Sequence, residues 1–482
     1  LGRLDVLLDT LLEQGMAVPA ANLSSYELGK LYTRAELQHS FATHFPGTKF
    51  RDKSALLDAI DALSEREQDW SGLVDGVITE RVVAPWGAEQ VQVLQLMFFG
   101  NRHQSLTEFV LSDLGVARYY PYRLDRQSRL FRQRKALQEY LECSTLRDTW
   151  YELRDQGDSQ GMRALAADVL CKNIVYPSSE QRWYRLCNAL ARDMERMGEM
   201  NTALALYSKS QRHPARERRA RVLEKTGDWS GAVAVCEEIL ASPWGEEEKE
   251  AASRILPRVR RKLGGTQSRQ RRDAFQHAYL QLLPGTGAVE LQAAAHLSQH
   301  WQSVHYVENK LMNTLFGLAF WEQIFAAVPG AFHNPYQSVP TDMYEPAFRT
   351  RRRDSLESRL AQLRDADLSQ FLSRAYTQYN SLQCRWVDWR RIDLELVRAA
   401  LRVIPRAHML AIWERMLFDP GENRRGFPDL IAIGEEVGDY YLIEIKAPGD
   451  ALQDSQKRWL RFFQQQDIPA QVAWVEWDAS AL

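Results

Sequence analysis

A proline-aspartate pair and a Glu-x-Lys segment lie close together near the end of this 482-residue chain. Pro428 and Asp429 open an apolar run, and Glu444-Ile445-Lys446 follows after fourteen intervening residues. Carboxylates are ligands that Mg²⁺ prefers, and such a cation neutralises charge on a phosphodiester and makes water nucleophilic. The ammonium group of Lys446 would orient that water or stabilise charge in the transition state. These residue types predict metal-dependent hydrolysis of a phosphodiester.

Two predicted strands would bring the two carboxylates together. Asp429 begins the strand 429–433, and Glu444 lies within the strand-like segment 440–447. The polar stretch 434–439 is bracketed by glycine and predicts a hairpin connection. Folding that hairpin moves Asp429 towards Glu444.

The alternation of side chains along a strand decides which groups face the predicted site. Glu444 and Lys446 point to one face, whereas Ile443 and Ile445 point into the core. The backbone carbonyl of Ile445 is a further candidate ligand, because it follows a carboxylate ligand directly. Asp429, Glu444 and Lys446 are therefore the predicted catalytic residues.

A helix and a third strand are predicted after this segment. The range 449–466 has apolar residues at helical spacing, and 471–477 resembles a strand, which gives the order strand, strand, helix, strand. Gln456 lies on the apolar stripe of the helix. It either hydrogen-bonds a metal ligand from behind or is a buried amide satisfied by the backbone.

Glu308 is a candidate acidic residue further upstream. In a predicted helix over 306–325 it lies on the stripe of Leu311, Leu315 and Leu318. A carboxylate on an apolar stripe is costly unless a partner or a cation neutralises it. The alternative is a residue of the first helical turn, where negative charge is favourable in any case.

Length and composition restrict the broad class. A chain of 482 residues is long enough for about three domains, and 45% apolar residues support ordinary cores. Five scattered cysteines without a Cys-x-x-Cys pair predict reduced thiols and no structural zinc. No apolar run of membrane-spanning length occurs, which predicts a soluble protein. The chain begins with Leu1, so the absence of a targeting segment carries little weight.

The net charge of −2 conceals basic clusters that suit a polyanionic partner. Their affinity for DNA would fall as salt rises, although charge runs are often only solvated faces. One tract, 254–272, contains no acidic residue, and others lie at 209–225, 123–135 and 349–353. The predicted DNA contacts are Lys49, Lys53, Arg123, Arg126, Arg216, Arg218, Arg219, Arg258 and Arg261.

The predicted fold is mainly α with a C-terminal α/β core. Predicted helices outside the core are 183–196, 202–210, 215–226, 229–241, 274–282, 289–297, 306–325, 356–376 and 394–418, with Pro405 kinking or splitting the last. The predicted domains are an N-terminal helical segment at 1–75, a mixed connecting region at 76–148, an α-solenoid at 149–265, and a nuclease domain at 266–482 with its core at 394–482.

These motifs resemble the VRR-NUC branch of the PD-(D/E)xK nucleases, and within it the Fanconi anaemia-associated nuclease family. The matching segments are 424–430, 442–450, 452–456, 459–460, Glu308 with 314–322, and parts of 106–134. Segments 35–37 and 45–60 resemble a SAP-type DNA-binding module, and 227–235 resembles a tetratricopeptide repeat. The family's vertebrate members carry an N-terminal ubiquitin-binding zinc finger that this sequence lacks, so a bacterial-type member is expected.

The resemblance implies a structure-specific DNA endonuclease that cuts 5′ flaps or branched DNA, with 5′-to-3′ exonuclease activity and a role in interstrand crosslink repair. It implies two Mg²⁺ or Mn²⁺ ions, one held by Asp429, Glu444 and the Ile445 carbonyl, and another shared by Glu308 and Asp429. Branched or flapped DNA is the expected partner, and protein partners stay unknown. A cytoplasmic, nucleoid-associated location is expected in a bacterium and a nuclear one in a eukaryote.

Two other functions stay open. A resolvase-like or restriction-like nuclease of the same superfamily would use the same chemistry, but it would not require the large helical portion. A non-catalytic DNA-binding scaffold would not need Asp429, Glu444 and Lys446 together.

Overall fold

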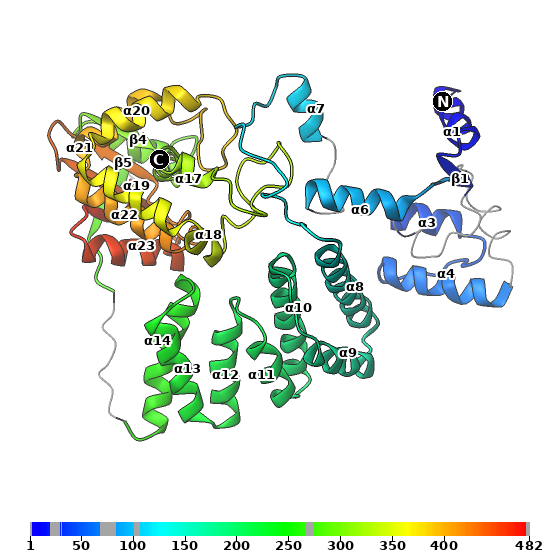
Figure 1. Ribbon diagram of the computed structural model, residues 1–482. Coiled ribbons are helices and arrows are strands. Elements are labelled where there is room, and N and C mark those ends of the chain that lie inside the picture. The colour runs from blue at the N-terminus through cyan, green and yellow to red at the C-terminus, as the bar shows by residue number, and fades with distance from the viewer. Residues whose placement is uncertain are drawn as a thin grey trace. The chain divides into compact units, whose positions relative to one another are not determined.

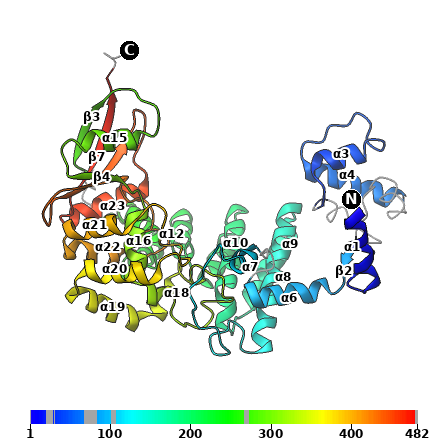
Figure 2. The ribbon, with the colours of Figure 1, turned by 90° about the horizontal axis from the view of Figure 1, so that it is seen from above.

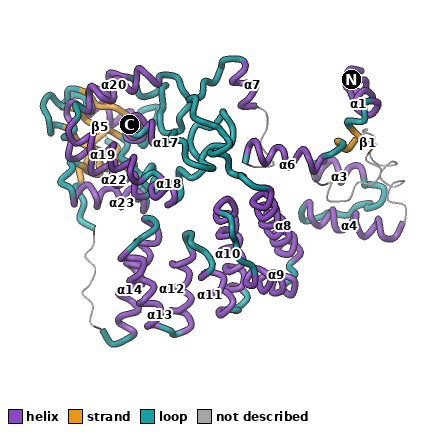
Figure 3. Tube along the Cα trace, viewed as in Figure 1, coloured by secondary structure: helices purple, strands orange, loops and turns teal. Residues whose placement is uncertain are grey.

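The computed structural model describes residues 2–19, 29, 31–67, 83–100, 107–265 and 273–478. The chain divides into two compact units, 1–104 and 105–482. Helices and loops make up most of the trace (Figure 3).

The first unit contains short helices and a two-stranded antiparallel sheet. Its elements are α1 (Gly2–Glu13), β1 (Ala17–Pro19), α3 (Arg34–Ser40), α4 (Lys53–Glu67), β2 (Val83–Pro85) and α6 (Ala88–Phe99). Helix α3 begins with a capping box, in which the Thr33 hydroxyl accepts from the Glu36 amide and the Glu36 carboxylate accepts from the Thr33 amide. Leu37 and Phe41 pack against Leu56 and Ile60, so α3 and α4 share a small hydrophobic core.

The second unit begins with helices, of which α8 to α14 form a row. They are α7 (Thr107–Asp113), α8 (Arg134–Gln156), α9 (Ser159–Cys171), α10 (Pro177–Arg196), α11 (Met200–Ser208), α12 (Ala215–Thr226), α13 (Trp229–Ala241) and α14 (Glu246–Lys262). Left-handed Gly157 and Gly227 end α8 and α12, and the side chains of Asp158 and Asp228 cap the next helices. Helices α8 to α14 follow one another side by side (Figure 1, Figure 2). This arrangement confirms the predicted succession of helices.

A five-stranded mixed sheet forms the centre of the rest of the unit, in the order β3-β7-β6-β5-β4. The strands are β3 (His277–Leu282), β4 (Ser303–Tyr306), β5 (Leu430–Ile433), β6 (Tyr440–Lys446) and β7 (Ala470–Trp477). The predicted hairpin is confirmed, because β5 and β6 pair antiparallel with Leu430 opposite Ile443. Strand β6 continues parallel to β7, and β7 parallel to β3.

Helices cover both faces of the sheet. On one face, α15 (Val289–Leu297) packs Ala293 and Ala294 against Ile443 and Ile445. On the other face lies a larger core, to which α16 (Lys310–Ala319), α17 (Trp321–Ile324), α22 (Arg406–Phe418) and α23 (Asp454–Gln465) contribute. The remaining helices are α18 (Pro346–Arg351), α19 (Arg353–Asp365), α20 (Leu368–Tyr379) and α21 (Leu394–Val403). Strand β6 is therefore buried on both sides.

Where upstream segments join the sheet, one predicted helix is wrong and another begins later than predicted. The range 274–282 forms β3, with Leu280 and Leu282 alternately buried against β7. The range 306–325 begins at the end of β4, and its helix starts only at Lys310. Both strands lie at sheet edges, where pairing with a partner far away in sequence overrides local helical spacing.

The other two long predicted helices are each divided. Pro405 separates α21 from α22, as predicted, because proline lacks the amide hydrogen that a continuous helix requires. The range 356–376 is divided as well, and there the Asp367 side chain caps a new helix by accepting from the Gln370 amide.

The five cysteines are free, as predicted. Cys143, Cys187, Cys236 and Cys384 are buried, whereas Cys171 is exposed at the end of α9.

Candidate active site

Asp429 lies directly before β5 and is held by backbone groups on two sides. Its carbonyl accepts hydrogen bonds from the amides of Val307, at 2.9 Å, and Glu308, at 2.8 Å. Its carboxylate Oδ2 accepts from the Ile445 amide at 2.9 Å. Asp429 thus connects the turn after β4 with the centre of β6.

Glu444 and Lys446 lie on the same face of β6, as the alternation predicts. The Nζ atom of Lys446 lies 2.8 Å from Oε1 of Glu444, and Gln456 on α23 donates to the same oxygen at 2.5 Å. Only 1% of Glu444 and 8% of Lys446 is exposed. Gln456 therefore contacts a predicted metal ligand, which favours the first of the two roles predicted for it.

Burial dominates the electrostatics of the carboxyl pair. It raises the pKa of Glu444 to about 8, and the neighbouring charge of Asp429 adds to the shift. Burial also raises the pKa of Asp429, while the Ile445 amide and Lys446 oppose that shift. Two buried acids side by side need a cation to be ionised together.

Glu308 does not belong to a helix, contrary to the prediction. It has a left-handed backbone with φ of 43° and precedes α16. Its carboxylate accepts from Nδ2 of Asn309 at 3.2 Å and from the hydroxyl of Tyr306 at 3.5 Å. A strained conformation of a non-glycine residue next to Asp429 is a mark of functional positions.

The donor set fits a divalent cation at the carboxyl pair. Oε2 of Glu444 is buried and has no hydrogen-bond partner in the described part of the chain, so one oxygen is free to be a ligand. Across the same described ranges, no three His, Cys, Asp or Glu side chains are grouped as ligands of one ion. The structure therefore brings Asp429 and Glu444 together, and Glu308 adjoins them through its backbone and not through its carboxylate.

Glu290 and Asn309 are members of the site that the sequence did not reveal. Glu290, in the first turn of α15, raises the pKa of both Asp429 and Tyr306 through its charge. Asn309 joins the turn after β4 to the segment before Asp429, because its Oδ1 accepts from the Phe427 amide at 3.1 Å. Glu290 lies on the same helix face as the apolar Ala293, and this position could have indicated a functional carboxylate. The sequence around Asn309 contains no comparable feature.

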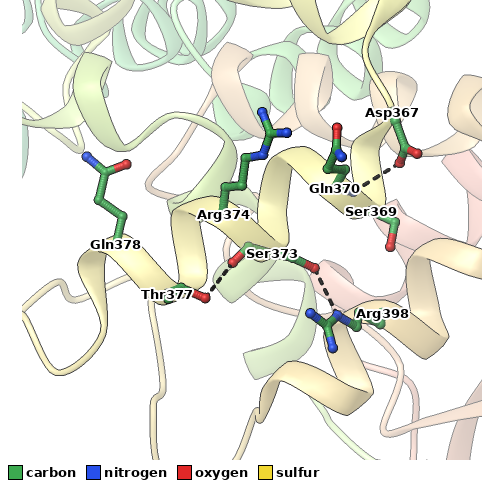
Figure 4. Close-up of a pocket in the computed structure, with 8 residues that line it drawn as sticks. All are labelled: Asp367, Ser369, Gln370, Ser373, Arg374, Thr377, Gln378 and Arg398. Atoms are coloured by element: carbon green, nitrogen blue, oxygen red, sulfur yellow. Dashed lines mark hydrogen bonds between the residues drawn. The ribbon is translucent and has the colours of Figure 1, made fainter.

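A polar groove of about 610 Å³ lies elsewhere, on α20 and α21 (Figure 4). Arg398, one of its lining residues, donates to the Ser373 hydroxyl at 3.1 Å. The carboxyl pair is not among the residues of its lining, so the groove is separate from the candidate active site.

One predicted DNA contact is wrong. Arg216 is 4% exposed, pairs with the buried Glu248 and donates to the Ser242 carbonyl at 2.9 Å, with its guanidinium over the Trp244 ring. An arginine enclosed in this way is part of the solenoid core, and it does not reach a phosphate.

Several other predicted DNA contacts have partners inside the protein. Arg218 pairs with Glu195, Arg258 pairs with Glu224 at 2.5 Å, and Arg123 pairs with Asp125 at 2.5 Å. The Nζ atom of Lys53 donates to the carbonyls of Gly29 and Tyr32. Much of the positive charge in the predicted clusters is thus neutralised by nearby carboxylates.

The remaining predicted contacts keep more of their charge available. Lys49, Arg126 and Arg261 are exposed and Arg219 is half-buried, and none of the four forms an ion pair with a residue that the structure describes. Part of the basic tract 254–272, namely 266–272, lies outside the described residues.

None of the helices in the described ranges combines the length and apolar character needed to cross a bilayer.

Comparisons with known proteins identify a family model and similar chains. A model of the VRR-NUC domain matches residues 363–477. The Fanconi-associated nuclease 1 homolog of Pseudomonas aeruginosa is 34% identical over 474 residues, which cover 97% of this chain and 83% of that protein. The Fanconi-associated nuclease 1 homolog of Arabidopsis thaliana is 24% identical over 422 residues, 76% of this chain and 46% of that protein.

A solved structure matches nearly the whole chain. The crystal structure of paFAN1 bound to 2nt 5′-flap DNA with gap superposes with a TM-score of 0.77 at 33% identity. The match covers 97% of this chain and 85% of that one.

Proposed function

Because the chain belongs to the Fanconi-associated nuclease family, we propose that it is a structure-specific nuclease that cuts 5′-flap DNA at the Asp429–Glu444 pair. The observation that carries the proposal is the buried contact of Glu444 with Lys446, at 2.8 Å, beside a second carboxylate. A carboxylate pair with an adjacent ammonium group suits hydrolysis of a phosphodiester better than it suits passive binding of DNA.

A divalent cation, when bound, supplies charge neutralisation at the phosphate and lowers the pKa of a water molecule. Asp429, Glu444 and the carbonyl of Ile445 would hold it, with the free Oε2 of Glu444 as one ligand atom. Lys446 would hold the attacking water or meet the charge that develops on the phosphate. Gln456 fixes the orientation of Glu444 through Oε1, which leaves Oε2 for the ion.

Glu308 would complete the site for another cation, shared with Asp429. The support is its backbone bond to the Asp429 carbonyl at 2.8 Å and its left-handed conformation. In this role the carboxylate would exchange its present contacts with Tyr306 and Asn309 for the cation. Mg²⁺ and Mn²⁺ both suit oxygen ligands of this kind.

The proposed substrate is a 5′ flap or a related branch, with stepwise 5′-to-3′ trimming as a second activity and interstrand crosslink repair as the setting. The support is the match to paFAN1 bound to 5′-flap DNA and to the Fanconi-associated nuclease 1 homolog of Pseudomonas aeruginosa. The solenoid and the exposed cations Lys49, Arg126 and Arg261 would contact the DNA backbone.

The test offers labelled 5′-flap, 3′-flap, four-way and single-stranded DNAs to the purified chain with Mg²⁺ or Mn²⁺. We expect cutting of the 5′ flap with either metal and none in EDTA. Asp429→Ala is expected to abolish cutting while binding of the flap persists, and Glu308→Ala to reduce it.

Two outcomes would contradict the proposal. Cutting confined to four-way DNA would identify a resolvase, and binding without cutting under either metal would identify a scaffold.

A further inference from the structure

Helix α14 of the solenoid contacts the nuclease domain through its first turns. Glu246 accepts from Arg415 at 3.1 Å, and its amide donates to Asp419 at 2.9 Å. One turn later, Oε2 of Glu250 accepts from Nη1 of Arg458 on α23 at 3.2 Å. Three separate nuclease residues are thus tied to one end of the solenoid.

Arg458 joins three elements at once. Its other terminal nitrogen, Nη2, donates to Glu422 at 2.9 Å, so one guanidinium bridges a solenoid carboxylate and a nuclease carboxylate. Glu422 lies in the loop 419–427, which leads directly to Pro428 and Asp429. The side chain of Arg458 is 12% exposed and that of Glu250 20%, so both are largely shielded from water.

Arg458 connects helix α23 with the loop 419–427, and each of these two elements leads to one of the catalytic carboxylates. Helix α23 carries Gln456, which holds Glu444 at 2.5 Å and lies half a helical turn before Arg458. The loop 419–427 lies against the same helix, because the Trp459 indole donates to the Arg425 carbonyl at 3.0 Å. A displacement of α23 would therefore move Glu444 through Gln456.

From this chain of contacts we propose that Glu250 is a positioning residue for the reaction, acting through Arg458 and Gln456 on Glu444. The solenoid then does more than hold DNA, because its last helix sets the geometry of the metal ligand. The inference deepens the proposed nuclease function, on which it rests. Glu250 lies on the solenoid and acts only through other side chains, so it is separate from the residues that touch substrate.

The test is a double-mutant cycle between Glu250→Ala and Gln456→Ala. Its readouts are the single-turnover rate on 5′-flap DNA at saturating enzyme, the dissociation constant for the same DNA in EDTA, and calorimetric affinity for Mn²⁺ alone. If Glu250 acts through Gln456, Glu250→Ala lowers the rate about 10-fold in the wild-type background and less than about 2-fold once Gln456 is absent, as coupled residues do. The Mn²⁺ affinity is expected to follow the same pattern, while the dissociation constant for DNA stays unchanged.

A matched control is Glu224→Ala. Glu224 on α12 has a similar exposure, 22%, and it also pairs with an arginine, but that partner, Arg258 on α14, belongs to the solenoid itself. We expect Glu224→Ala to leave both the saturated rate and the Mn²⁺ affinity unchanged.

Additive effects of the two substitutions, or an effect of Glu250→Ala on DNA affinity alone, would overturn the inference. A wild-type chain that binds Mn²⁺ but cuts no DNA would contradict the proposed function. The double-mutant cycle measured by Mn²⁺ affinity would still test the inference.

Discussion

Lys446 allows a direct test of chemistry at the scale of one residue. Its ammonium group lies beside Glu444, and the residue is only 8% exposed, so water has little access to this position. We expect Lys446→Met to lower the single-turnover rate on 5′-flap DNA by about 10²–10³-fold, the usual loss when a group that stabilises the transition state is removed. Lys457→Met serves as the control and is expected to cut normally, because the Lys457 side chain on α23 is 36% exposed and pairs with Asp454 and not with the carboxyl pair. Equal rates for the two variants would exclude a catalytic role of Lys446.

Glu444 gives the metal-free protein a characteristic pH dependence. Its pKa of about 8 in the folded state lies above the value of about 4 in an unfolded chain, so the folded state holds an extra proton between these limits. The free energy of unfolding therefore falls as pH rises from about 4 to 8. Thermal unfolding in EDTA over this range checks the slope. Glu444→Gln is expected to flatten it, and an unchanged slope would show that another group is responsible.

Arg216 is expected to matter for stability and not for DNA binding. Replacing it by Met leaves Glu248, which is fully buried, without its ion-pair partner. Removal of one member of a buried pair costs about 3–5 kcal/mol of unfolding free energy. Thermal unfolding measures the loss. The fully folded variant is expected to bind flap DNA with an unchanged Kd. If the folded variant binds flap DNA more weakly than the wild type, Arg216 does contact DNA, as the sequence predicted.

At the scale of elements, the loop before Asp429 depends on Gly426. Its φ is 84°, and an added Cβ would lie 2.6 Å from the Ser455 carbonyl carbon at the start of α23. We expect Gly426→Ala to push the loop away from α23 and to lower the cleavage rate about 10-fold or more, because small misplacements of catalytic groups are costly. Gly438→Ala is a matched control, since Gly438 has a φ of 94° with nothing within 4 Å of the added atom. If both variants lose activity equally, backbone strain and not the contact with α23 is the cause.

The elements nearest the site were predictable because their signals are local. The hairpin of β5 and β6, the helix that carries Gln456, and the break at Pro405 each follow from alternation, helical spacing or proline chemistry within a few residues. Strands β3 and β4 were not predictable, because each acquires strand character only by pairing with a segment more than a hundred residues away.

The same distinction applies to side chains. The contact of Glu444 with Lys446 follows from their spacing on one strand, whereas the position of Glu308 depends on two backbone bonds to Asp429. Arg216 shows the limit for charged residues, since a sequence records the positive charge of a cluster but not the acidic partners that fold against it.

At the scale of the whole molecule, DNA affinity should depend on fewer cations than the sequence contains. Each phosphate contact contributes about one unit to the slope of log K against log salt. We therefore expect Arg126→Ala and Arg261→Ala each to reduce that slope for 5′-flap DNA by about one unit. Arg260→Ala is the comparison, because Arg260 is already paired with Glu237 at 2.7 Å and is expected to change the slope little. Fluorescence anisotropy at several salt concentrations measures the slope for all three variants. If Arg126→Ala and Arg261→Ala have the same slope as the wild type, neither arginine contacts a phosphate.

The distribution of thiols makes the natural chain suitable for spectroscopic labelling. Burial raises the pKa of Cys143, Cys187, Cys236 and Cys384, which keeps these thiols protonated and shielded from maleimides. Cys171, at the end of α9, is exposed. A single fluorophore can thus be attached to the solenoid without any substitution, and energy transfer to a dye on the flap strand would then report how the DNA approaches.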